Sequence, residues 1–214
     1  MLSFSQDPST VTISCSNAIP SEIAFHSLTL NGLNFSESAV IDNSDHTALI
    51  NSVFENSNGQ SAYTFNGAQM SITSCTFSGN CAPNGAALNV PNAACSFYSN
   101  VIFTNNVASV AGGAICTTQV LLFSNGASVQ FTSNSAPKGG AIYMSSGGFV
   151  AFAGSNLTFT SNTGSAIYAT DFGGSFQPGS TAAFISNTGS SKEIQTQKKK
   201  SHQYFIFMHF CPKN

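Results

Sequence analysis

The acidic segment DNSDH at residues 42–46 is the part of this chain that comes closest to a catalytic site by residue type and spacing. Glycoside hydrolysis needs two carboxyl groups that flank the scissile bond, commonly about 5 to 10 Å apart. Asp42 and Asp45 are the only close acidic pair, but they stand between the apolar runs SAVI and TALI. We therefore interpret the segment as a polar turn, and we predict no catalytic residue and no enzymatic activity.

The histidines do not indicate a metal site either. His26, His46, His202 and His209 are too scattered to match a familiar ligand spacing. The sequence also contains no phosphate-binding loop, no G-x-S-x-G elbow and no dinucleotide fingerprint. We predict neither a metal ion nor a cofactor.

Two short motifs recur along the chain. Segments of the form Phe-x-x-Asn follow one another at spacings of 23, 26, 28, 28 and 25 residues, counted from a weaker copy at Phe54. After most of them comes a second signal, in the forms NGAAL, GGAIC, GGAIY and GSAIY. The repeat-motif residues are Phe77, Asn80, Phe103, Asn106, Gly112, Gly113, Ala114, Ile115, Phe131, Asn134, Gly139, Gly140, Ala141, Ile142, Phe159, Asn162, Phe184 and Asn187. A near-constant period of this length indicates a repeat architecture.

Each period divides into three short strand-like runs, such as AIYM, GFVAF and NLTFT after Gly139. Gly, Asn and Ser separate the runs and leave no room for helices of ordinary length. The residue two before each repeated Phe is small or apolar, so the two share an inner face. One coil cannot bury its own Phe, so coils must stack through parallel strands. The sequence predicts an all-β fold, a right-handed parallel β-helix (a pectin-lyase-like solenoid) of about seven coils over residues 1–190.

Such a solenoid gives every repeated residue a structural role. Phe is expected to stack on Phe along the axis, and Asn on Asn at a turn, where Asn tolerates left-handed backbone. The Gly pair would allow a tight corner with positive φ. These roles require no partner molecule.

The cysteines could be core thiols or disulfide partners. None of the six forms a C-x-x-C pair. Cys75 is expected to point inward beside Phe77, and Cys81 lies just beyond the following Asn. A bridge from Cys75 to Cys81, or one between stacked coils to Cys95 or Cys116, is a hypothesis.

Charge is scarce and unevenly distributed. Asp, Glu, Lys and Arg make up 7% of residues, against about a quarter in ordinary globular domains. Residues 1–190 hold seven acids and one Lys, a formal charge of −6, whereas residues 191–214 hold five Lys and one Glu, a charge of +4. A mildly acidic body without a clustered basic surface argues against nucleic acid as a partner.

The alternation of GGAI with FTNN, FTSN and FISN resembles the passenger domain of the chlamydial polymorphic membrane proteins. The resemblance covers roughly residues 54–190. It implies an autotransporter-type protein of the cell outer membrane and bacterial surface, with a β-helical passenger, a C-terminal barrel and a role as an adhesin for host cells. We expect no secretory signal and no barrel within this chain, so its own localisation stays open.

The segment 191–214 departs from the repeat. SNTGS at 161–165 continues into AIY, whereas SNTGS at 186–190 continues into SKEIQTQKKK. We expect an unstructured basic and aromatic tail, translated out of frame after about Ser190. The alternative is a native tail that meets an anionic membrane.

Three functions follow from these observations. The leading one is a surface adhesin whose passenger contacts a host-cell protein or glycan and meets the membrane only through a barrel outside this chain. The second is a non-exported remnant of a truncated gene, and an open end of the solenoid would favour self-association in either case. The third is a polysaccharide-active β-helix enzyme, which the absence of Arg disfavours because lyases of this architecture usually use an Arg base.

Overall fold

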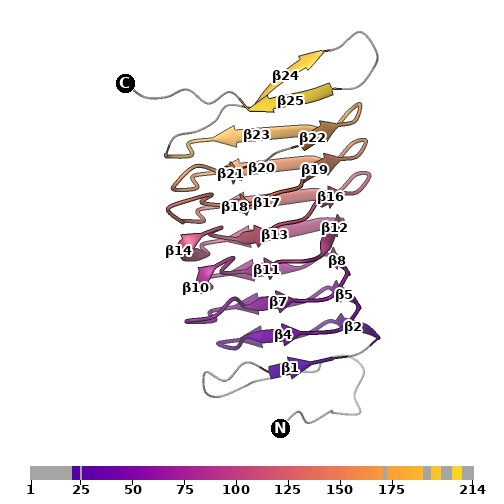
Figure 1. The fold of residues 1–214 in the computed structure, drawn as a ribbon, viewed down its shortest axis with the longest axis vertical. Coiled ribbons are helices and arrows are strands. Elements are labelled where there is room, and N and C mark those ends of the chain that lie inside the picture. The colour runs from indigo at the N-terminus through magenta and orange to yellow at the C-terminus, as the bar shows by residue number, and fades with distance from the viewer. Residues whose placement is uncertain (1–20, 25, 171–172, 190–193, 199–203, 209–214) are drawn as a thin grey trace.

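The protein folds as a parallel β-solenoid of the right-handed type in the computed structural model (Figure 1). The structure describes residues 21–24, 26–170, 173–189, 194–198 and 204–208. These residues form no helix that is long and apolar enough to cross a membrane. Each of the three long sheets contains seven parallel strands, which confirms the predicted fold. The chain completes about six turns, which roughly matches the predicted coil number.

The first sheet holds short strands of three residues in the order of the chain. They are β1 (Ser21–Ile23), β4 (Val40–Asp42), β7 (Tyr63–Phe65), β11 (Leu88–Val90), β15 (Ile115–Thr117), β18 (Ile142–Met144) and β21 (Ile167–Ala169). The third sheet contains β3 (Asn34–Ser36), β6 (Val53–Glu55), β9 (Thr76–Ser78), β13 (Asn100–Thr104), β17 (Ser128–Thr132), β20 (Asn156–Thr160) and β23 (Thr181–Ile185).

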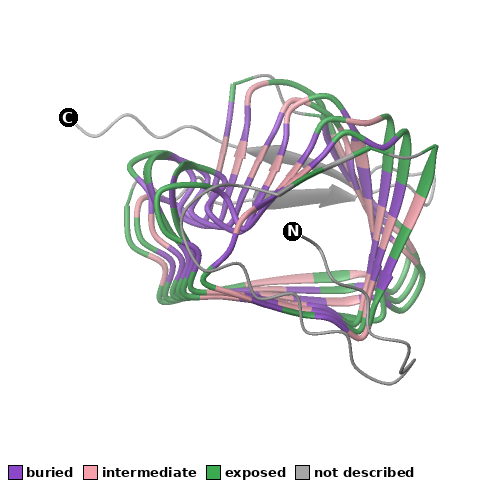
Figure 2. Ribbon diagram, turned by 90° about the horizontal axis from the view of Figure 1, so that it is seen from below, coloured by how far each residue is buried: buried purple, intermediate pink, exposed green. Residues whose placement is uncertain are grey.

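The second sheet lies between them in each coil. It contains β2 (Ser27–Asn31), β5 (His46–Ile50), β8 (Gln69–Thr73), β12 (Ala94–Tyr98), β16 (Leu121–Phe123), β19 (Gly148–Ala151) and β22 (Gly173–Phe176). A small fourth sheet pairs β10 (Cys81–Asn84) with β14 (Val107–Ala111) at one corner. Seen along the long axis, the three long sheets enclose a buried interior (Figure 2).

The interior is organised as columns of equivalent side chains. Phe35, Phe54, Phe77, Phe103 and Phe131 lie in one column, and neighbouring rings are stacked with centroids 4.8 to 5.0 Å apart. Phe159 and Phe184 continue this column at the same spacing. Because in-register parallel strands repeat every ~4.8 Å, each ring meets its copy one rung away at stacking distance.

The left-handed residues lie one position away from where the sequence suggested. The residue before each motif asparagine has positive φ, as at Gly79 (65°), Asn105 (55°) and Ser133 (54°), whereas the motif asparagines themselves do not. The expectation that the repeated Asn adopts left-handed backbone is therefore wrong. The preceding residue turns the chain, and this turn points the Asn side chain into the corner. The Gly corner is as expected, since Gly112 and Gly139 have φ of 65° and 64°.

The segment 191–214 contains two strands where we expected an unstructured tail. β24 (Ile194–Lys198) pairs antiparallel with β25 (Tyr204–Met208), and β25 pairs antiparallel with Ser175 and Phe176 of β22. The aromatic and β-branched content of YFIFM favours a strand at this position. The remainder of the segment lies outside the described residues.

Candidate functional site

The motif asparagines form a continuous hydrogen-bonded ladder inside one corner of the solenoid. Asn80 Nδ2 donates to Asn106 Oδ1 at 2.8 Å, Asn106 Nδ2 to Asn134 Oδ1 at 2.9 Å, and Asn134 Nδ2 to Asn162 Oδ1 at 3.1 Å. The second Nδ2 hydrogen of each reaches a Phe carbonyl of the preceding coil, as from Asn134 to Phe103 at 3.0 Å. The same Oδ1 also accepts a backbone N–H, since Asn106 N donates to Asn134 Oδ1 at 3.1 Å. The ladder thus connects successive coils through direct side-chain hydrogen bonds.

The repeat-motif residues are almost all inaccessible to a partner. Asn80, Asn106, Asn134 and Asn162 have no exposed surface, and the motif Phe, Ala and Ile side chains from Phe77 to Phe159 are equally buried. Phe184 and Asn187, in the last described rung, are the exceptions, and Phe184 is 39% exposed. Contact with another molecule must therefore come from the outward-facing residues between the motifs.

The segment DNSDH divides its two carboxylates between the interior and the solvent. Asp42 is fully buried, where Tyr63 Oη donates to its Oδ2 at 2.7 Å, Thr47 Oγ1 donates to the same oxygen, and Ser44 N donates to Oδ1 at 2.9 Å. Burial, and then the neighbouring carboxylate, raises the pKa of Tyr63 well above its ordinary value. These bonds hold the turn between β4 and β5, which agrees with the predicted polar turn.

Asp45 lies on the surface instead, where His26 Nδ1 is 3.0 Å from its Oδ2. A sugar substrate on the surface could reach Asp45 but not Asp42, so the geometry does not form an acid and base pair across a cleft. Among the described residues, no group of three or more His, Cys, Asp or Glu side chains could hold a metal ion. His202 and His209 lie outside the described residues.

The disulfide hypothesis is not supported by the structure, in which Cys75, Cys81, Cys95 and Cys116 are free. The reason is their placement on four different sides of the coil. Cys95 and Cys116 lie in the second and first sheets, Cys81 in the fourth, and Cys75 just before β9. Their ladder neighbours are other residue types, such as Met70 and Leu121 for Cys95. Cys75 is buried as expected, and its Sγ donates to the Thr73 carbonyl.

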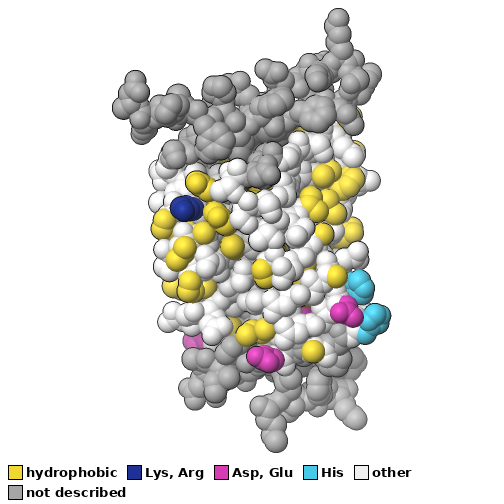
Figure 3. Space-filling view, viewed as in Figure 1, with side chains coloured by type: hydrophobic (Ala, Val, Ile, Leu, Met, Phe, Trp, Pro, Cys, Tyr) yellow, Lys and Arg dark blue, Asp and Glu magenta, His cyan; other side chains and the backbone are white. Residues whose placement is uncertain are grey.

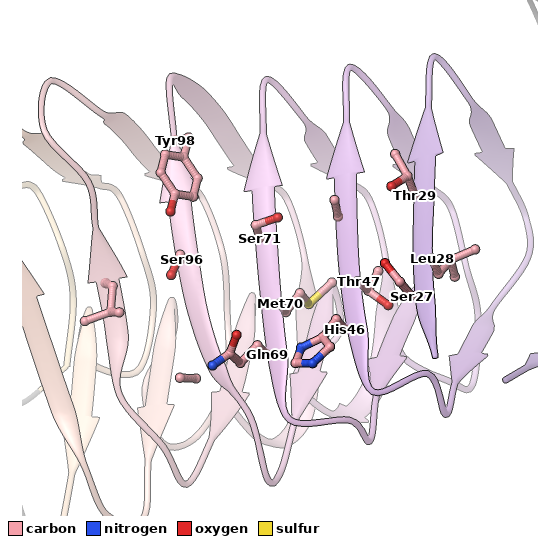
Figure 4. A pocket seen from close by; sticks show the side chains of 13 residues that line it. Ser27, Leu28, Thr29, His46, Thr47, Gln69, Met70, Ser71, Ser96 and Tyr98 are labelled. Atoms are coloured by element: carbon pink, nitrogen blue, oxygen red, sulfur yellow. The ribbon is translucent and has the colours of Figure 1, made fainter. Parts of the chain in front are cut away.

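The outer face of the second sheet carries a groove that sequence reasoning missed. It has a volume of about 380 Å³ and crosses β2, β5, β8, β12 and β16 (Figure 4). Its lining includes Ser71, Ser96, Gln69, His46 and Tyr98. A second hollow shares Ser96, Tyr98 and Leu122 with it and extends toward Phe152. One signal in the sequence could have indicated this groove. Small residues recur from coil to coil at an outward position of the middle strand of each period.

A different outward surface surrounds the fourth sheet. Val107 and Val110 of β14 are 46% and 53% exposed. The segment APNG contributes its first three residues to β10, and SAPK pairs with β14 through bridges at Ser135 and Lys138. Few charged side chains occur on the face seen in Figure 3, which presents scattered apolar side chains among uncharged polar ones. That face therefore offers mainly hydroxyl, amide and apolar groups, with few charges.

Comparison with protein families finds the Chlamydia polymorphic membrane protein repeat at residues 100–118 and 128–145. The two matches include β13 and β17 with their Phe-x-x-Asn copies, and the GGAI corners at Gly112 and Gly139. No curated protein and no solved structure matches the chain significantly. Residues 100–118 and 128–145 are thus similar to polymorphic membrane protein repeats, and this similarity together with the solenoid fold fits the passenger of an autotransporter.

Proposed function

We propose that this chain is a β-helical passenger segment of a bacterial surface adhesin that contacts host cells. The proposal rests on the observation that the matched repeats supply their Phe and Asn side chains to internal columns. The interior therefore keeps the rod stiff, while the outward positions between the motifs are free to differ from coil to coil. Many weak contacts along one stiff face would add through avidity.

The proposed location is the cell surface, with attachment to the outer membrane supplied by a part of the protein beyond these residues. The membrane protein named by the matching repeat supports this location. We also propose a role without catalysis, since the buried Asp42 cannot act with the exposed Asp45. Incubation with acidic polysaccharides should release no reducing ends and no unsaturated products.

The adhesion test uses beads coated with the full chain and added to cultured epithelial cells. We expect folded protein to bind cells well above beads coated with albumin. The matched control is the variant Asn134→Asp, which places a second carboxylate oxygen against the Phe103 carbonyl and breaks the ladder. Equal binding by the folded chain and by this variant, or binding no better than albumin, would contradict the proposal.

The non-exported remnant is the second candidate, and protein location separates it from the adhesin. Antibodies against residues 131–190 should label intact bacteria if the passenger is exported. Label that appears only after the cells are made permeable would favour the remnant.

A further inference from the structure

Three rows of outward side chains shape the groove on the second sheet. The middle row runs through Thr29, Ala48, Ser71 and Ser96, which are paired in register from β2 to β12. Beside this row stand some larger side chains, although Ser27 and Ala94 on one side are small (Figure 4). His46 and Gln69 form one side wall of the groove, and Tyr98 stands on the opposite side. Because strands repeat every ~4.8 Å, the five strands give the groove a length of roughly 19 Å.

The groove offers hydrogen-bonding groups that no atom of the described residues uses. Ser71 and Ser96 are half-buried in its floor, and within the part of the chain that the structure describes neither hydroxyl has an intramolecular partner. A hydroxyl both donates and accepts, and the Gln69 amide on the side wall does the same with separate atoms. Tyr98 is 45% exposed at the place where the two hollows meet, so much of its ring is open to a ligand.

The lining contains no Asp, Glu, Lys or Arg. An acidic glycan would find no Lys or Arg there, and burying its charge without a partner is costly. A peptide strand would need free backbone N–H and C=O groups, but those of the five strands are paired with one another along the sheet. An uncharged sugar chain presents hydroxyls for the serines and apolar C–H faces for the tyrosine ring.

We infer that this groove binds an uncharged, extended glycan chain lying across the coils. Tyr98 packs against a sugar face, and Ser71, Ser96 and Gln69 hydrogen-bond its hydroxyls. The inference rests on the proposed adhesin function, for which it supplies the class of ligand.

The test measures binding of N-acetyllactosamine oligomers, from two to eight sugars long, to the full chain by calorimetry. Affinity should rise with length until the groove is filled. Tyr98→Ala should weaken binding roughly tenfold, the usual scale for losing one aromatic contact. Ser71→Leu should abolish binding because the longer side chain fills the floor. The matched control is Tyr143→Ala, the same change on the outer face of the first sheet, which should bind as the unmodified chain does.

Circular dichroism and the urea midpoint establish that each variant is folded before binding is compared. No binding of any neutral oligomer would overturn the inference, as would equal binding by all variants or preference for heparin oligosaccharides. The adhesin proposal is tested separately by cell binding of the same variants. Full binding of Tyr98→Ala beads to cells would contradict the groove inference but leave the adhesin proposal intact. No binding of the unmodified chain to cells would contradict the adhesin proposal.

Discussion

Each internal asparagine of the ladder uses the full hydrogen-bonding capacity of its side-chain amide. Asn134 donates twice, to Phe103 O and Asn162 Oδ1, and accepts twice at Oδ1, from Asn106 N and Nδ2. Four bonds are the most that a primary amide can make through two hydrogens and two lone pairs. No other side chain of this size could replace it, because Asp lacks the donors and Leu lacks all four groups.

Asn134→Ala should destabilise the protein more than the loss of side-chain packing alone would. The change removes the donor to the Phe103 carbonyl, and it leaves the Asn106 backbone N–H and one Asn106 Nδ2 hydrogen without their acceptor. Each buried group that loses its partner costs about 1 to 3 kcal/mol. We expect a loss of about 3 kcal/mol or more in the free energy of unfolding, measured by urea titration with far-UV circular dichroism. The control is Asn125→Ala, an exposed turn asparagine of the neighbouring segment, which should change stability by less than about 0.5 kcal/mol. Similar losses for the two variants would show that the ladder contributes little.

The cysteines should differ in reactivity according to their burial. Burial raises the pKa of Cys75 and of Cys116 to about 11, and it raises that of Cys95 still further. In a Cys15→Ser, Cys211→Ser background, iodoacetamide at pH 8 should therefore modify the exposed Cys81 first, as read by mass spectrometry. Fast labelling of all four thiols in the folded protein would contradict this order.

The same shifts predict how stability depends on pH. A thiol whose pKa is higher in the folded state keeps its proton there while the unfolded chain loses it. The stability that these thiols contribute is present below the unfolded pKa of about 8.5, and it declines as pH rises toward about 11. Urea midpoints measured from pH 7 to 10.5 should fall, and replacing Cys116 with Ser should reduce the fall.

At the level of the corner, the second glycine of each GGAI motif is required by close packing of coils. A Cβ on Gly140 would overlap the backbone of Thr163 in the next coil, and one on Gly113 would overlap the Gly140 carbonyl. Neither has positive φ, so space alone decides. We expect Gly140→Ala to cost about 1 to 3 kcal/mol, as overpacked sites do.

Gly154 provides the matched comparison for this prediction. It has φ of 70° but no atom nearer than 3.9 Å to an added Cβ, so Gly154→Ala tests backbone strain without crowding. We expect about 1 kcal/mol for that strain. Thermal unfolding of both variants measures the difference. A Gly140→Ala variant as stable as the unmodified chain would mean that neighbouring coils can separate freely at this corner.

The strands were largely predictable because each period repeats the same pattern of apolar, polar and turn-forming residues. AIYM, GFVAF and NLTFT became β18, β19 and β20 to within one residue, and the inward position of the residue two before each Phe was confirmed. The left-handed turn position was missed because Asn and its predecessor are both turn-forming types. The groove could not be predicted, since its shape depends on the register that brings Ala48, Ser71 and Ser96 side by side across 23 to 25 residues of chain.

The whole molecule is a rod whose coils lie in register. The last described coil therefore has backbone groups that could pair with another strand. The second sheet continues past β22 into β25 and β24, whereas β23 is the last described strand of the third sheet. Its Phe184 and Ile185 are 39% and 51% exposed, so apolar side chains accompany a backbone edge that pairs with no other described strand. Such an edge can pair with a strand of another chain.

We therefore predict that the full chain associates reversibly through β23, with a larger sedimentation coefficient at higher protein concentration. Ile185→Lys should suppress this association, because a charge on an edge strand opposes pairing with a second copy. The control is Val110→Lys, which introduces the same charge at a similarly exposed residue, 53% against 51%, but on β14 of the fourth sheet. If both variants associate as the unmodified chain does, the contact lies elsewhere. If both dissociate equally, added charge acts through general repulsion, and the edge of β23 has no special role.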